Sequence, residues 1–191
     1  MAYTAFDSAD IIIETERLYL RRFTQHDRDG LAAMLKDPET MYAYEHGFSD
    51  NEVQAWLDKQ LARYAQYGFG LWAAIEKATG RLIGQCGLTM QDADGEEMLE
   101  IGYIFNRAYW HMGYATEAAS ACKRYAFDTL NVDEVCSIIR DNNLPSQAVA
   151  RRNGMVPVKT FVKHYYGIDM PHIVFSAKRE KSQSYKNLIW R

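Results

Sequence analysis

The sequence is poor in the residues that metal proteins and disulfide-rich proteins depend on. Its three cysteines are an odd number with no Cys-x-x-Cys pair, and its five histidines are scattered. No structural metal site and no disulfide framework is therefore predicted. We expect Cys86, Cys122 and Cys136 to be buried free thiols in a reducing compartment. Only four of the 191 residues are proline and 48% are hydrophobic, a composition that excludes disorder and collagen-like repeats.

A strong charge of one sign and long apolar runs are also missing. The net charge is −3, so no global positive field attracts nucleic acid or an anionic membrane, and neither is expected as a partner. No stretch reaches the ~18 apolar residues of a membrane span, and residues 1–7 lack the basic start of a signal peptide. These features predict a cytoplasmic protein, and the length predicts one domain.

Short β-prone runs and amphipathic stretches alternate along the chain. The runs over 71–75, 82–88 and 99–105 are separated by turns and are predicted to pair as consecutive antiparallel strands. Asp50 is the candidate N-cap of one helix, and Gly154 is the candidate C-cap of another. Strands are expected over 18–23, 71–75, 82–88, 99–105, 135–139, 159–164 and 172–177, and helices over 24–35, 50–67, 113–130 and 146–153.

The junction between the strand over 99–105 and the next helix carries the clearest chemical signal. It reads Asn-Arg-Ala-Tyr-Trp-His-Met-Gly-Tyr-Ala-Thr-Glu over 106–117. A helix N-terminus presents unpaired N–H donors, and Gly113 and Ala115 leave room for a phosphate to approach the backbone. The same residues are also typical of an ordinary capping turn. No Gly-x-x-x-x-Gly-Lys-Ser/Thr motif occurs, and no Gly-x-Gly-x-x-Gly follows the first strand, so ATP hydrolysis and dinucleotide binding are not predicted.

A polar segment follows the strand over 135–139. It reads Arg-Asp-Asn-Asn-Leu-Pro-Ser-Gln-Ala-Val-Ala-Arg-Arg-Asn-Gly-Met, and Asn143 and Ser146 place an amide and a hydroxyl at the carboxyl end of that strand. With this segment, the sequence resembles the GNAT-type N-acetyltransferase superfamily and, within it, the branch of ribosomal-protein N-terminal acetyltransferases. The resemblance covers residues 15–179, which leaves 1–14 as an N-terminal extension and 180–191 as a polar tail.

The resemblance implies an α+β fold, a mixed α/β sandwich with helices on both faces of a mostly antiparallel central sheet. In this family the fourth and fifth strands, here 99–105 and 135–139, splay apart, and acetyl-CoA lies in the opening. The family's Gln/Arg-x-x-Gly-x-Gly/Ala pyrophosphate loop falls on residues 110–115, with Trp110 in place of Gln or Arg. The residues that the resemblance assigns to the cofactor are Tyr103, Ile104, Phe105, His111, Met112, Gly113, Tyr114, Ala115, Thr116 and Asn143.

Acetyl transfer from a thioester to an amine needs a neutral nitrogen, a stabilised oxyanion and a proton for the departing thiolate. At pH 7 an α-amine with a pKa of about 7.7–8.0 loses about 1 kcal/mol to protonation, whereas a lysine with a pKa near 10.4 loses roughly 4.6 kcal/mol. A weak base therefore suffices for an α-amine acceptor.

Two residues are candidates for the proton transfers. Glu100 lies on an otherwise apolar strand face, where it could act as the base; the alternative is a carboxylate at a wet edge or one paired with an arginine. Many relatives place a tyrosine four residues before the glycine that follows the last helix, but this position is Ala150 here. Ser146 is thus the candidate acid, and the alternative is an ordinary helix N-terminal hydroxyl.

The sequence contains fewer features that point to the acceptor than to the cofactor. The expected acceptor is the α-amine of a protein or peptide N-terminus. We expect the acetyl group to be transferred directly, without a covalent intermediate, because no Cys-His pair is evident. The alternatives are a small amine or antibiotic, or a non-catalytic CoA-binding interaction protein. His164 and His172 are expected near the acceptor site, where structural hydrogen bonds are the alternative role, and Glu45 could contact a cationic acceptor or be an exposed charge. The assembly is expected to be a monomer or a homodimer.

Overall fold

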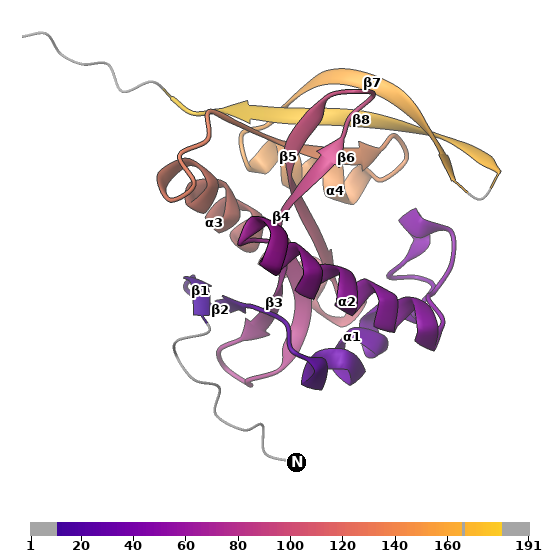
Figure 1. The fold of residues 1–191 in the computed structure, drawn as a ribbon, viewed down its shortest axis with the longest axis vertical. Coiled ribbons are helices and arrows are strands. Elements are labelled where there is room, and N and C mark those ends of the chain that lie inside the picture. Colours follow the sequence, from indigo (N-terminus) through magenta and orange to yellow (C-terminus); the bar gives the residue numbers. More distant parts are fainter. Residues whose placement is uncertain (1–10, 166, 181–191) are drawn as a thin grey trace, which may run out of the picture.

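The computed structural model describes residues 11–165 and 167–180, and their eight strands form one sheet in the order β1-β2-β3-β4-β5-β6-β8-β7 (Figure 1). Neighbouring strands are antiparallel except for β5 and β6. The expected antiparallel series β3-β4-β5 is therefore confirmed. The strands are β1 (Ile11–Glu14), β2 (Leu18–Arg21), β3 (Leu71–Glu76), β4 (Leu82–Asp92), β5 (Glu97–Phe105), β6 (Glu134–Arg140), β7 (Val156–Tyr165) and β8 (Ile168–Lys178).

Helices cover both faces of the sheet. On β4 the consecutive residues Gln85 and Cys86 point to opposite faces, as the pleat of a strand requires. Gln85 accepts a hydrogen bond from the Trp56 indole of α2, whereas the Cys86 Sγ lies 3.5 Å from the Cys122 Sγ of α3. The expected layered α+β architecture is thereby confirmed. The helices are α1 (Arg28–Leu35), α2 (Asp50–Tyr67), α3 (Tyr114–Asp128) and α4 (Leu144–Arg152), with short 3-10 turns at Gln25–Asp27, Tyr42–Tyr44 and Arg107–Tyr109.

The sheet splits between β5 and β6. These parallel strands share a single residue pair, Glu100 with Cys136, and they have no further pairing toward the carboxyl end of β5. Two hydrogen bonds bridge the start of the opening: Ser137 Oγ donates to the Ile101 carbonyl at 2.8 Å, and the Ile138 amide donates to Glu100 Oε1 at 3.2 Å. The splayed strands that the family resemblance implies are present.

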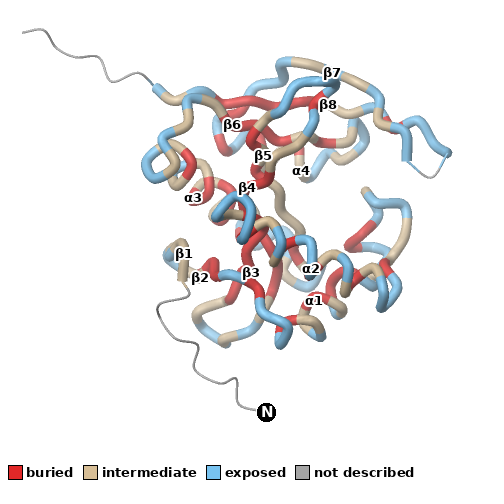
Figure 2. Tube along the Cα trace, viewed as in Figure 1, coloured by how far each residue is buried: buried red, intermediate tan, exposed pale blue. Residues whose placement is uncertain are grey.

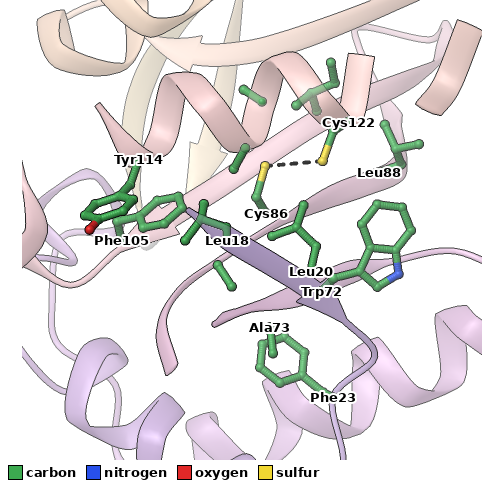
Figure 3. Packing of buried hydrophobic residues seen from close by; sticks show 14 of the residues in the cluster. Leu18, Leu20, Phe23, Trp72, Ala73, Cys86, Leu88, Phe105, Tyr114 and Cys122 are labelled. Carbon is green, nitrogen blue, oxygen red and sulfur yellow. Dashed lines mark hydrogen bonds between the residues drawn. The ribbon is translucent and has the colours of Figure 1, made fainter. Parts of the chain in front are cut away.

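The core lies between the central strands and the helices. Figure 2 shows the central strands mostly in the colour of buried residues, with exposed segments on the outer turns of the helices and at the far end of β7. Figure 3 shows Leu18, Leu20 and Trp72 packed together beneath α3, with the two sulfur atoms of Cys86 and Cys122 facing each other. All three cysteines are buried free thiols, as expected from the sequence.

Several boundaries differ from those expected. The helix over 50–67 is capped by Ser49, which forms a capping box with Glu52, so the choice of Asp50 as the cap was wrong by one residue. Strand β1 was not predicted, although its isoleucines are β-prone, because a four-residue edge strand is too short to give a clear period. Most of the expected extension, residues 1–10, and almost all of the tail, residues 181–191, lie outside the described part of the chain.

None of the helices in the described ranges is long and apolar enough to cross a membrane.

Candidate active site

The turn between β5 and α3 places its backbone in an unusual conformation. His111 and Gly113 both have positive φ, 61° and 85°, and Gly113 is the residue that precedes the first turn of α3. A glycine adopts this conformation without the strain of a Cβ atom. The Trp110 indole donates a hydrogen bond of 2.7 Å to the Phe105 carbonyl, which ties the turn back to the end of β5. Trp110 therefore has a structural role at the position where relatives carry Gln or Arg.

The first amides of α3 remain free. No side chain caps this helix, and the N–H groups of Tyr114, Ala115 and Thr116 have no acceptor within the described residues. Such amides, together with the positive end of the helix dipole, are suited to an anion. Of the two interpretations of this turn, the free amides favour an anion site over a self-contained capping turn.

Arg17, which no sequence pattern singled out, stabilises this turn. Its guanidinium donates to the Met112 carbonyl at 2.9 Å, pairs with Glu117 at 2.7 Å and lies 4.3 Å from the centre of the Tyr114 ring. Glu117 also accepts a hydrogen bond of 2.6 Å from the Thr15 hydroxyl, so two residues that precede β2 hold its carboxylate. No local sequence motif could have identified this arginine, because it lies 100 residues before its partner Glu117 in the chain.

A cavity of about 980 Å³ begins at these amides and runs along the exposed edge of β5 to α4; we call it the α3 cavity. Nine of the ten residues assigned to the cofactor line it. The exception is Met112, whose side chain is exposed and whose carbonyl is bound by Arg17. The nine lining residues are Tyr103, Ile104, Phe105, His111, Gly113, Tyr114, Ala115, Thr116 and Asn143.

Asn143 and Ser146 sit where α4 begins. The Asn143 side chain caps α4 by accepting from the Ser146 amide at 3.1 Å, and it also accepts from the Tyr42 hydroxyl at 2.6 Å. The Ser146 carbonyl accepts from the Tyr103 hydroxyl at 2.9 Å. Burial raises the pKa of Tyr103, so this hydroxyl stays protonated at neutral pH. The Tyr103 side chain therefore joins β5 to α4, a contact that no sequence pattern predicted.

A second cavity, of about 450 Å³, opens on the other side of this junction, and we call it the Glu100 cavity. Ser146 and Glu100, the two candidate catalytic residues, both line it. The two cavities meet at a shared group of six residues, which are Ala43, Tyr44, Tyr103, Ile104, Asn143 and Ser146.

Glu100 is partly buried and hydrogen-bonded at both carboxylate oxygens. Oε1 accepts from the Ile138 amide, and Oε2 accepts from the Thr89 hydroxyl at 3.3 Å. Burial raises the pKa of this carboxyl, opposed by the Ile138 hydrogen bond and by the nearby charges of Lys163 and Arg63. In the described part of the chain Glu100 forms no ion pair with an arginine. It is neither the wet-edge carboxylate nor the arginine partner that the sequence left open.

The remaining candidates fall in different places. His172 lines the Glu100 cavity, where its Nδ1 lies 2.8 Å from the Met170 carbonyl and where burial lowers its pKa. His164 is exposed and pairs with Asp169 at 2.5 Å, outside both cavities. Glu45 forms an ion pair with Arg140 at the edge of the Glu100 cavity. Ala150, at the position of the tyrosine of many relatives, is buried in the core.

The α3 cavity fits acetyl-CoA. Its free amides suit a diphosphate, and the unpaired edge of β5 offers backbone groups to an amide-bearing chain such as pantetheine. Tyr103 and Ser146 lie at the end of the α3 cavity that opens into the Glu100 cavity. No bulky side chain closes this route at Gly113, where a Cβ atom would meet only the tip of Arg17, at 3.4 Å.

Comparisons with known proteins agree with this geometry. Residues 17–156 match the family model described as the acetyltransferase (GNAT) domain. The uncharacterized protein YkkB of Bacillus subtilis is 35% identical over 150 residues, covering 78% of this chain and 87% of the relative. The FsC-acetyl coenzyme A-N(2)-transacetylase of Aspergillus fumigatus is 29% identical over 184 residues, covering 88% and 77%.

Solved structures agree as well. The crystal structure of a GNAT-family acetyltransferase from Bacillus anthracis superposes with a TM-score of 0.76 at 24% identity, covering 88% of this chain and 99% of that one. The matched domain spans the free amides of α3, the splayed strands and the Asn143–Ser146 segment. The chain therefore belongs to the GNAT family of acetyltransferases.

Proposed function

We propose that this protein transfers the acetyl group of acetyl-CoA directly to the α-amine of a protein or peptide N-terminus. The observation that carries the proposal is the meeting of two cavities at Tyr103 and Ser146. The α3 cavity ends in free amides suited to a diphosphate, and the Glu100 cavity contains a carboxylate suited to an amine. When bound, acetyl-CoA supplies an acetyl group already activated as a thioester.

Glu100 is the proposed base. A carboxyl whose pKa is raised by burial accepts a proton from an ammonium group more readily than an ordinary glutamate. An α-amine has a pKa of about 7.7–8.0, so its deprotonation asks little of such a base. The two hydrogen bonds from Ile138 and Thr89 fix the carboxylate in the cavity and leave its other lone pairs for the acceptor amine or a bridging water.

Ser146 is the proposed acid for the departing thiolate: as its hydroxyl gives a proton to the sulfur, it takes up the second proton that the amine nitrogen loses on becoming an amide. Its amide and carbonyl are engaged by Asn143 and Tyr103, so its position at the junction of the cavities is fixed while the hydroxyl remains available. The cysteines offer no covalent route, since none of the three lines either cavity and burial raises the pKa of the Cys136 thiol. Direct transfer is the mechanism that these residues support.

Polycationic acceptors are disfavoured by charge. The Glu100 cavity is lined by Lys59, Arg63, Arg140 and Lys163 but by a single carboxylate, Glu100. An aminoglycoside or a polyamine would place several like charges against these side chains. Of the small-amine alternatives, basic antibiotics are therefore the least suited to this site.

The test is an acetyl-transfer assay with a panel of peptides that carry free N-termini and contain no lysine. We expect release of the CoA thiol together with α-N-acetylated peptide, identified by mass spectrometry. Matched peptides with blocked N-termini should yield neither product. A non-catalytic CoA-binding protein would bind acetyl-CoA in calorimetry and release no thiol with any acceptor, and that result would overturn the proposal.

A further inference from the structure

Three cations in the Glu100 cavity have no acidic partner. Lys59 and Arg63 lie one turn apart on α2, and Lys163 extends from β7. Within the described residues none of the three forms an ion pair. Arg63 donates to the Gln60 side-chain oxygen at 3.2 Å, and the Lys163 ammonium lies 5.5 Å from the centre of the Phe161 ring.

Arg140, in the same cavity, provides the contrast. Its guanidinium pairs with Glu45, so its charge is already balanced by a neighbour. The three unpaired cations face one carboxylate between them, that of Glu100, and it contacts none of them within ion-pair distance. The cavity therefore holds a surplus of positive charge in a chain whose overall charge is −3.

The unbalanced positive charge in the Glu100 cavity is energetically unfavourable. Burial lowers the pKa of the half-buried Arg63, which means that its charge has lost part of its hydration. Lys59 is more exposed, and its pKa is lowered by partial burial and by the charge of Arg63. Lys59 and Arg63 also repel each other across one helical turn. An anion bound between α2 and β7 would offset both effects, because it would replace the lost water and separate the like charges.

We infer that the acceptor carries a carboxylate close to its reactive amine, the amine lying at Glu100 and the carboxylate between Lys59, Arg63 and Lys163. The inference rests on the proposed function and specifies its substrate class. A peptide whose first residue is acidic and a free acidic amino acid share this chemistry.

The experiment compares matched acceptors with the wild-type enzyme. One pair consists of C-terminally amidated peptides that differ only in beginning with Glu or Gln, and the other pair is the α-amides of the single amino acids glutamate and glutamine, so that neither neutral member carries a carboxylate. We expect kcat/KM about tenfold higher for the acidic member of at least one pair. A preference seen in the peptides identifies an acidic N-terminus, and a preference confined to the two amino-acid amides identifies a small-molecule acceptor.

Variants then locate the effect. Arg63→Gln and Lys163→Gln should each raise KM for the acidic acceptor by about tenfold more than KM for the neutral acceptor, with the affinity for CoA unchanged. Both charges also act on the pKa of Glu100, so any change in kcat should be the same for the two acceptors. The control is Lys178→Gln, an exposed lysine of β8 outside both cavities, which should change none of these values. Thermal melts confirm that each variant is folded, and the two single variants act as independent checks.

The possible failures are distinguishable. Equal use of the acidic and neutral members by the wild type, or an equal effect of Lys178→Gln, would overturn the inference and leave the proposed transferase intact. Absence of thiol release with every acceptor, acidic or neutral, would overturn the transferase itself.

Discussion

At the scale of single residues, Glu100 combines a structural and a chemical task. Its carboxylate accepts the Ile138 amide across the opening of the sheet, and it faces the cavity where the amine is proposed to lie. The raised pKa of Glu100 also affects the free energy of unfolding, because the folded protein keeps this proton to a higher pH than the unfolded chain does. Ionisation of Glu100 therefore removes stability as the pH rises through its two pKa values, first the unfolded and then the folded.

Glu100→Gln separates these tasks. The amide oxygen can still accept from Ile138, so the free energy of unfolding at neutral pH should be at least that of the wild type. Turnover at pH 7 should fall by roughly 100-fold or more because the base is lost. The acidic limb of the kcat profile, which rises with pH as Glu100 ionises, should disappear. Glu97→Gln, an exposed position on the same strand, is the matched control, and equal losses in the two variants would contradict the assignment.

Ser146→Ala tests the proposed acid. Only the hydroxyl is removed, since it is the Ser146 backbone that donates to Asn143 and accepts from Tyr103. We expect kcat to fall by roughly 100-fold with the dissociation constant of CoA unchanged in calorimetry. Ser120→Ala, on α3 outside both cavities, should behave as wild type. An unchanged kcat for Ser146→Ala would contradict the role of acid and would indicate that Ser146 is an ordinary hydroxyl at the N-terminus of α4.

At the scale of elements, the first turn of α3 is tested by Gly113→Glu. The substitution places a side chain and a negative charge beside the free amides at a φ of 85°. We expect CoA binding to weaken by at least about 100-fold, since an anion is repelled and its approach is blocked.

Gly95→Glu is a stringent control for this variant. Gly95 has the same φ of 85°, and nothing lies within 4 Å of a Cβ atom built there, so the backbone strain is matched without any effect on the α3 cavity. Its CoA affinity should equal that of the wild type. Equal affinities in both variants would argue against the diphosphate site.

Sequence patterns predicted most elements because their signals are local. The helix at 50–67 has the expected limits, and the antiparallel series β3-β4-β5 follows from short turns between β-prone runs. The contacts that complete the site are not local. Arg17 reaches the start of α3 from a distant segment, and the cations of the Glu100 cavity come from α2 and β7, so no spacing in the sequence connects them.

At the scale of the whole molecule, the sheet is divided into two parts that meet at one parallel residue pair. The α3 cavity crosses this division, with walls from β5 and α3 on one side and from α4 on the other. A ligand that contacts both parts should therefore reinforce the weakest connection of the sheet.

CoA at 100 times its dissociation constant should stabilise the folded state by about 2.7 kcal/mol, which corresponds to a rise in Tm of roughly 5–10 °C. Differential scanning fluorimetry measures this rise, and hydrogen exchange should show added protection at α4 as well as at α3. Protection limited to α3 would mean that the ligand does not span the division. Gly113→Glu should show neither change.

The group of six residues shared by the two cavities has a kinetic consequence. Tyr103, Ser146 and their neighbours present one side to each ligand, so the first ligand to bind completes the surface that the second will contact. Acetyl-CoA bound along β5 would complete that surface for the small acceptor, whereas the acceptor alone would leave most of the α3 cavity open. Turnover should accordingly follow a compulsory sequence, with the donor entering first and free CoA departing last.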